Sequence, residues 1–102
     1  MVVGTLVVDV LLGDVHSLKQ KRGVVRPILA ELRRRFDVAA AETGSLDLHR
    51  RAELAVAVVS SARTHAGEVL DACERLVADR PEIELLSARH RVLDDDDLEN
   101  WP

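Results

Sequence analysis

Apolar residues occupy both alternations of two segments in this chain, residues 2–12 and 52–60. The first of these segments is rich in β-branched valine and ends at Gly13-Asp14. A strand in the middle of a sheet has this composition, because neither of its sides is fully open to water. The pattern therefore predicts two central strands.

A helix is expected between these two strands, starting at Ser17. Ser17 is a favourable N-cap residue, and Gln20 three residues later completes a capping box. Gly23 and Pro27 lie inside the helix, and Pro27 favours a kink because it lacks a backbone donor. The apolar residues nevertheless keep a helical period and form one face: Leu18, Val25, Ile28, Leu29, Leu32 and Phe36.

The remaining segments complete a β-α-β-β-α-β order. Residues 37–42 predict a short strand, residues 43–50 a loop, and residues 64–79 a second helix that Pro81 ends. Residues 82–93 predict an edge strand with a bulge at Leu85-Leu86, where the alternation changes phase. This order predicts an α+β fold, a ferredoxin-like sandwich in which two helices cover one face of a four-stranded antiparallel sheet. We expect residues 1–93 to form a single domain.

The two central strands have two different faces by alternation. The face under the helices takes Leu6, Val8, Val10, Leu54, Val56 and Val58. The opposite face takes Val3, Thr5, Val7, Leu11, Ala55, Ala57 and Val59. This second face is too apolar to be left in water comfortably. A homodimer through the open sheet face is the simplest expectation, and a different protein partner is the alternative.

Composition narrows the class of protein further. The 102 residues contain two aromatic side chains, Phe36 and Trp101, so the stacking platforms that read unpaired bases are nearly absent. Cys73 is the only cysteine, which excludes an intrachain disulfide and favours a reducing compartment. The sequence shows no signal peptide and no apolar run of membrane-spanning length. We therefore expect a cytoplasmic protein.

The net charge of −4 is unevenly distributed. Residues 94–102 carry four aspartates and one glutamate, whereas residues 17–35 carry seven basic residues and one acid. Local positive charge of this kind attracts phosphates. We expect residues 94–102 to be a mobile tail. A sharper hypothesis is that this tail folds back onto the basic helix and competes with an anionic ligand.

The basic residues of the first helix form a stripe. Lys19, Arg26 and Arg33 are seven residues apart and line up, and Arg22 lies between them and the apolar face. Arg50 and Arg51 add charge in the loop between the second and third strands. These six residues are the candidate nucleic-acid or anion-binding residues. A solvated helix face and an ordinary polar hairpin loop are the alternative interpretations, and both remain open.

Other candidate chemistry is weak. Lys21 projects near the apolar side of its helix, where we expect a structural ion pair with a strand-end carboxylate such as Asp9 or Asp14. The histidines lack the i, i+4 spacing of a helical metal pair, so no metal site or cofactor is expected. Asp14 and His16 form a conceivable acid–base pair, but no nucleophile or oxyanion hole accompanies them, so no catalytic residues are assigned.

Several of these segments resemble one known family. The resemblance rests on Met1-Val2-Val3-Gly4, on His16-Ser17-Leu18-Lys19-Gln20-Lys21-Arg22 followed by Val25, on residues 36–42, and on Val58-Val59-Ser60. On these residues the chain is similar to the YlxP-like family of bacterial domains, whose function is unknown. In relatives an aromatic residue often stands where this chain has His49.

The resemblance implies a ferredoxin-like fold. It also implies a role connected with translation, because genes of this family often lie among translation genes, near the gene of a ribosome-maturation factor. Together with the basic stripe it suggests a non-enzymatic accessory protein that binds RNA or the ribosome. The alternative is a dimeric interaction module that binds a protein through the open sheet face. A small-molecule enzyme using Asp14 and His16 is the third hypothesis.

Overall fold

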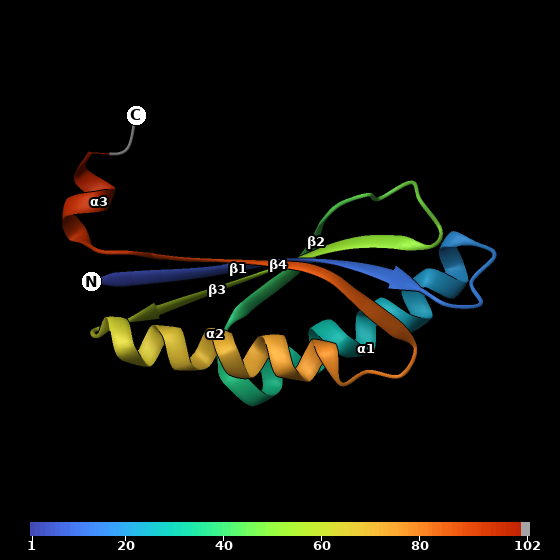
Figure 1. The fold of residues 1–102 in the computed structure, drawn as a ribbon, viewed down its shortest axis with the longest axis horizontal. Helices are drawn as coiled ribbons and strands as arrows, with labels where there is room; N and C mark the ends of the chain where they lie inside the picture. The colour runs from blue at the N-terminus through green and yellow to red at the C-terminus, as the bar shows by residue number, and fades with distance from the viewer. Residues whose placement is uncertain (101–102) are drawn as a thin grey trace.

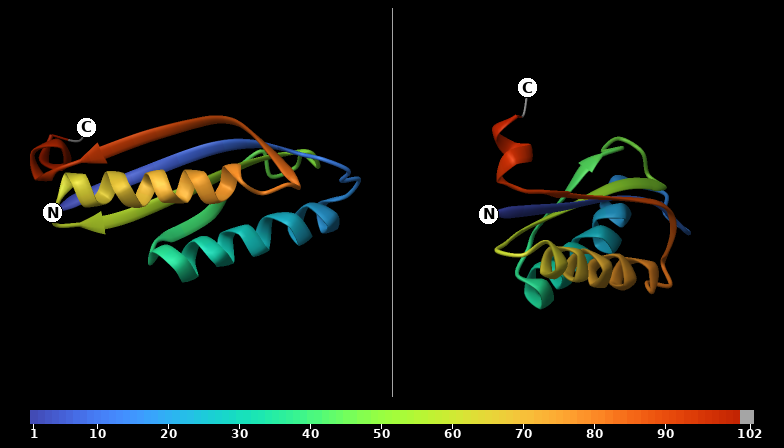
Figure 2. Two further views of the ribbon diagram at one scale, coloured as in Figure 1. Left: turned by 60° about the horizontal axis from the view of Figure 1, so that its bottom comes forward. Right: turned by 60° about the vertical axis from the view of Figure 1, so that its left-hand side comes forward.

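The computed structural model describes residues 1–100 and contains one four-stranded antiparallel sheet. The strands are β1 (Val2–Leu12), β2 (Ala39–Gly44), β3 (Arg51–Ser60) and β4 (Ile83–Leu93), in the spatial order β2-β3-β1-β4. The helices are α1 (Leu18–Phe36), α2 (Arg63–Ala78) and the short α3 (Asp95–Glu99). Helices α1 and α2 cover the same face of the sheet (Figures 1 and 2). This arrangement confirms the α+β class and is consistent with a ferredoxin-like sandwich.

The core lies between the sheet and these two helices. Every residue that alternation assigned to the helix-covered face is buried: Leu6, Val8, Val10, Leu54, Val56 and Val58. From the helices, Ile28, Leu32 and Leu70 are fully buried against them. On the opposite face, called the open face here, the side chains of β1 and β3 are only partly buried, and Val59 is 70% exposed.

Strand β2 begins two residues later than the sequence pattern predicts. Asp37 ends α1 in the left-handed conformation, with φ 52° and ψ 52°, so the chain turns before it can enter the sheet. The strand then continues to Gly44, past the predicted end at Glu42, and its register with β3 is irregular between Glu42 and Gly44. The boundary was wrong because the alanine-rich segment carries no clear period.

The predicted bulge in β4 is confirmed. Asp9 of β1 pairs with Ser87, whereas the next residue, Val10, pairs with Leu85, so Leu86 is the extra residue. The bulge allows the side chains on both sides of it to stay on their proper faces of the sheet, which explains the phase change in the sequence.

The start of α1 agrees with the predicted cap in part. The Gln20 backbone N–H donates to Ser17 Oγ over 3.1 Å, as a capping box requires. The Gln20 side chain, however, accepts from the backbone N–H of His16, one residue before the cap. Helix α1 runs without interruption through Pro27 to Phe36.

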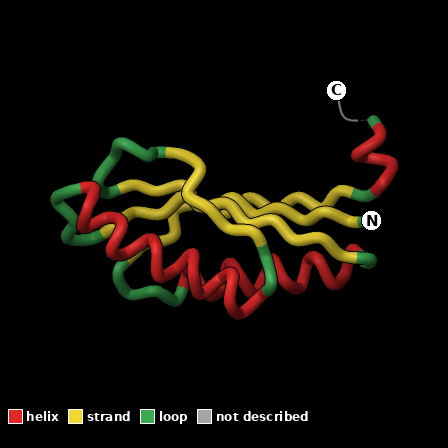
Figure 3. Tube along the Cα trace, turned by 180° about the vertical axis from the view of Figure 1, so that it is seen from behind, coloured by secondary structure: helices red, strands yellow, loops and turns green. Residues whose placement is uncertain are grey.

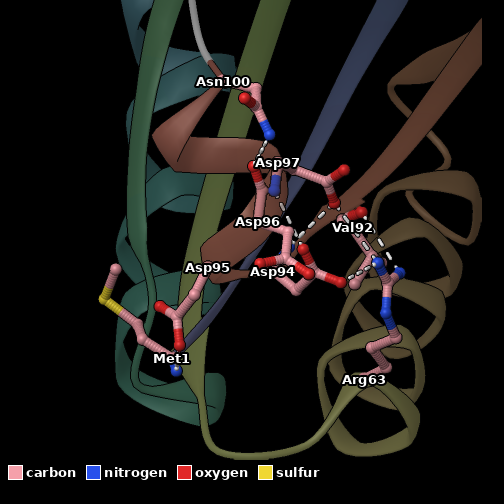
Figure 4. A network of polar contacts seen from close by, with 8 residues as sticks. All are labelled: Met1, Arg63, Val92, Asp94, Asp95, Asp96, Asp97 and Asn100. Atoms are coloured by element: carbon pink, nitrogen blue, oxygen red, sulfur yellow. Dashed lines mark hydrogen bonds and ion pairs between the residues drawn. The ribbon is translucent and has the colours of Figure 1, made fainter.

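Residues 94–99 do not approach the basic helix. Helix α3 lies near the N-terminus, at the end of the sheet opposite to the start of α1 (Figure 1). Its ion pairs join Asp94 and Asp97 to Arg63, at 2.9 and 3.3 Å, and Asp95 to the ammonium group of Met1, at 2.9 Å (Figure 4). The hypothesis that this segment covers the stripe on α1 therefore finds no support in the described residues. The mobility of the tail stays a prediction.

We expect α3 to detach in acid. The backbone N–H of Asp97 and the Arg63 guanidinium stabilise the charged form of Asp94 and lower its pKa to about 2, from an ordinary 3.8. A depressed folded-state pKa contributes stability above the ordinary value, and that contribution is lost as the pH falls from 3.8 toward 2. A carboxyl-detected NMR titration should show Asp94 titrating near 2, with the amide signals of α3 shifting in the same window. The Arg63→Ala variant should titrate nearer the ordinary value, and an unchanged Asp94 pKa in that variant would refute the assignment.

Candidate nucleic-acid interface

Lys21 is the one charged side chain inside the described core, with 2% of its surface exposed. Its Nζ atom lies 2.7 Å from Glu42 Oε2 and donates to the carbonyl oxygens of Ser45 and Leu48, each at 2.8 Å. Among the described residues, Lys21 is the only polar partner of this buried Glu42 oxygen. The ammonium group therefore has three oxygen partners, as a buried cation requires.

The structural role predicted for Lys21 is thus confirmed, but the partner is different. Glu42 of β2 takes the place that the sequence analysis gave to Asp9 or Asp14. Asp9 instead accepts a hydrogen bond from Ser87 over 3.0 Å, and Asp14 lies 2.6 Å from the ring of His16. Because Lys21 contacts β2 and the loop after it, the first turns of α1 and the loop at residues 45–50 are held together.

Three cations of the predicted stripe point into solvent. Lys19, Arg22 and Arg26 are exposed and have no ion pair or hydrogen bond from their side chains to any of residues 1–100. Together with Gly23 and Pro27 they line a surface hollow of about 380 Å³. Gly23 contributes to the hollow because, apart from its chain neighbours and the nearby backbone of its own helix, nothing lies within 4 Å of the position its missing Cβ would take. We call these three residues the free cations.

The single acid of α1 does not neutralise the free cations. The Glu31 carboxylate pairs with Arg35 at 3.3 Å and with Arg80 of the segment after α2. Arg35 also lies over the ring of Phe36. No acid among residues 1–100 therefore neutralises the positive charge at the start of α1 by an ion pair.

Two members of the predicted set have structural contacts instead. The Arg33 guanidinium donates through Nε, at 3.1 Å, and through a terminal nitrogen to the carbonyl oxygen of Ala40, which ties α1 to β2. Arg50 Nε donates to the carbonyl oxygens of Leu12 and Gly13, at 3.1 and 3.0 Å. Both side chains remain charged, but their positions are fixed by the protein. Sequence reasoning missed these contacts because they depend on how distant strands pack.

Arg51 belongs to a second hollow at the same end of the molecule. This hollow, of about 500 Å³, lies between the loop before α1 and the loop after β2. His16 and His49 line it together with Arg50 and Arg51. The sequence analysis did not assign the two histidines to the site, and the spacing of 33 residues between them gave no signal.

The Asp14–His16 pair does not have the surroundings of a catalytic site. The His16 ring lies 2.6 Å from Asp14 Oδ1, but the two side chains are 77% and 93% exposed. Ser17, the nearest hydroxyl in sequence, is used as the helix cap. Within residues 1–100 no group of three or more histidine, cysteine, aspartate or glutamate side chains is placed to hold a metal ion.

Cys73 does not have the properties of a reactive cysteine. The side chain is fully buried in α2, and burial raises the pKa of its thiol to about 11. A thiol in this state is neutral at physiological pH and poorly nucleophilic.

No helix in the described part of the chain is long and apolar enough to cross a membrane.

These features define a class of protein: a small α+β sandwich whose free cations lie together on the first half of one helix. Residues 3–90 match the family described as a protein of unknown function, DUF503, and the chain belongs to that family. The chain is also 33% identical over 76 residues to the uncharacterized protein YlxP of Bacillus subtilis (strain 168). The aligned segment covers 74% of this chain and 83% of that protein. The expected YlxP-like family is thereby confirmed.

Removal of the buried ammonium should destabilise the protein strongly. In a Lys21→Met variant, Glu42 loses its ion-pair partner and two loop carbonyls lose their donor. Breaking a buried pair on one side costs about 3 kcal/mol or more. We expect that loss in the free energy of unfolding, measured by urea titration. The matched control is Lys19→Met, two residues away on the exposed side, which should change stability by less than about 0.5 kcal/mol. Equal effects of the two substitutions would contradict the role given to Lys21.

Proposed function

We propose that this protein binds the phosphate backbone of RNA through the free cations at the start of α1, as a non-enzymatic accessory of ribosome assembly or RNA handling. The observation that carries the proposal is the exposure of Lys19, Arg22 and Arg26, side by side and without partners among residues 1–100. Protein surfaces that bind polyanions use such unpaired cations, because each phosphate that they neutralise releases counterions.

The second hollow extends this surface. Arg51 and the two histidines lie at the same end of the molecule as the free cations, since the loop at residues 45–50 is tied to α1 by Lys21. Lysine and arginine at this end would contact phosphates without reading the base sequence. No phenylalanine, tyrosine or tryptophan lines either hollow, which fits recognition by shape and charge better than the use of large stacking platforms for unpaired bases.

The link to the ribosome rests on the family resemblance, since the relative from Bacillus subtilis is itself uncharacterized. A structured RNA with a regular backbone is the partner that these three neighbouring cations favour. The acidic helix α3 lies at the far end of the sheet, so its charge does not obstruct such a partner (Figure 1).

Charge reversal on α1 should weaken RNA binding and reduce its dependence on salt. We expect Arg26→Glu to weaken binding to a fluorescent RNA hairpin at least tenfold, and Lys19→Glu/Arg26→Glu to reduce the slope of log affinity against log salt by about two. Fluorescence anisotropy across a salt series measures both quantities.

The matched control is Arg75→Glu, because Arg75 is also an exposed helical arginine without a partner among residues 1–100. This substitution changes the net charge equally but lies on α2. It should leave the affinity within about twofold of wild type. Equal losses for Arg26→Glu and Arg75→Glu would show that net charge alone drives the binding, and would reject the proposed site.

The second candidate function, a protein-interaction module, uses the open face. The observation that favours it is an apolar hollow of about 600 Å³ on that face, floored by side chains such as Val7, Ala55 and Ala57. Binding through this surface would hold or tighten as salt is raised, in contrast to phosphate binding.

A further inference from the structure

The open face is higher on one side than on the other. Strand register aligns four residues in each row across the sheet. One row is Arg91, Thr5, Ala57 and Ala39, and the next is Arg89, Val7, Ala55 and Ala41. In these two rows the long side chains therefore start from β4, where Arg89 leans over β1 toward Glu53, and the short ones lie on β3 and β2. The result is a ridge of arginines beside a hollow of alanines, and both line the same depression.

This step in height is complementary to itself under one particular symmetry. If a second copy turns over about a twofold axis that runs parallel to the strands, between β1 and β3, its β4 lies above β2 of the first copy. The arginine ridge of each copy then fills the alanine hollow of the other. A twofold axis across the strands would instead place ridge on ridge, which leaves the hollows empty. Both arrangements are isologous, as closed dimers usually are, but only the first fills the two hollows.

Charge favours the same arrangement. The Arg89 guanidinium reaches across β1 toward Glu53 of β3, at a loose 3.6 Å, and its side chain is 64% exposed. Glu53 also accepts a hydrogen bond from Thr43 over 2.7 Å. An axis between β1 and β3 brings both copies of Arg89 and Glu53 into one charged cluster, with Asp9 beside Glu53 in the same row, and there each arginine can pair with the partner's carboxylate as well as its own.

The size of the face is adequate for such a contact. Three strands of 10 or 11 residues and one of 6 residues, about 4.8 Å apart, make a face of roughly 600 Å² in projection. Stable interfaces bury about 800 Å² of accessible surface on each partner, and side-chain relief adds to the projected area. Helix α3 stands on the open-face side only beyond the end of the sheet, so it leaves the face accessible (Figure 3).

We propose that two copies of this chain pack open face to open face about a twofold axis parallel to the strands, with Arg89 of each copy paired to Glu53 of the other. The contact covers the apolar side chains of β1 and β3, including Val59. It leaves both α1 helices on the outside, so that the dimer would present two sets of free cations. The dimer does not depend on RNA binding, and each property has its own test.

The first test is the mass in solution. Light scattering after size-exclusion chromatography should give twice the 11.3 kDa of one chain for the wild type. An Ala57→Arg variant, which fills the hollow with a charged side chain, should be a monomer. The control Ala30→Arg places the same side chain on the exposed surface of α1 and should remain a dimer.

The second test reads the register directly and does not depend on the folding of a variant in the hollow. Arg89→Glu places like charges together in its homodimer, and Glu53→Arg does the same with opposite sign, so each variant alone should be largely monomeric. When the two are mixed, both contacts between the copies join opposite charges. Native mass spectrometry should then show the heterodimer as the main species.

A wild type that is monomeric over the whole concentration series would overturn the proposal and leave the face to another partner. A dimer that persists in Ala57→Arg would place the interface elsewhere. Mixed variants that form no heterodimer would reject the register.

Discussion

The structure depends on a buried ammonium group. Lys21 places a charge inside an aliphatic core, and this is favourable only because Glu42 and two loop carbonyls surround it. These partners come from β2 and from the loop that follows it, so a single side chain fixes α1 against both. The contacts that offset the cost of burying the Lys21 ammonium also fix the position of the loop at residues 45–50. The second hollow of the candidate binding surface is lined by this loop.

The neighbours of Lys21 show how α1 divides its charges. Lys21 points inward, whereas Lys19 and Arg22 point outward beside the hollow at Gly23. Farther along the helix, Arg33 is committed to a carbonyl oxygen of β2. The three free cations therefore lie on the first half of α1, whereas Arg34, also exposed and without a side-chain partner among residues 1–100, lies in its last turn. The acidic helix α3 lies at the opposite end of the molecule from the free cations (Figure 1). A partner with many phosphates would be attracted to the end with the free cations and repelled by the end with α3.

The sequence predicted those parts of the fold that depend on local patterns. Alternation assigned the two faces of β1 and β3 correctly because register fixes which side each residue takes, and the phase change in β4 marked its bulge. The start of β2 depended on the left-handed turn at Asp37, which no periodicity reveals. The partner of Lys21 and the carbonyl contacts of Arg33 and Arg50 depend on residues brought together only by tertiary packing. Sequence reasoning therefore found the cations but not which of them are free.

An NMR titration with RNA would show whether the free cations form the surface that binds it. Isotope-labelled protein titrated with an RNA hairpin should show its largest amide shifts in residues 19–26 and in the loop at residues 45–51. Residues 95–99 of α3 and the alanines of the open face should shift little. Dominant shifts on the open face or α3, with residues 19–26 unchanged, would contradict the account.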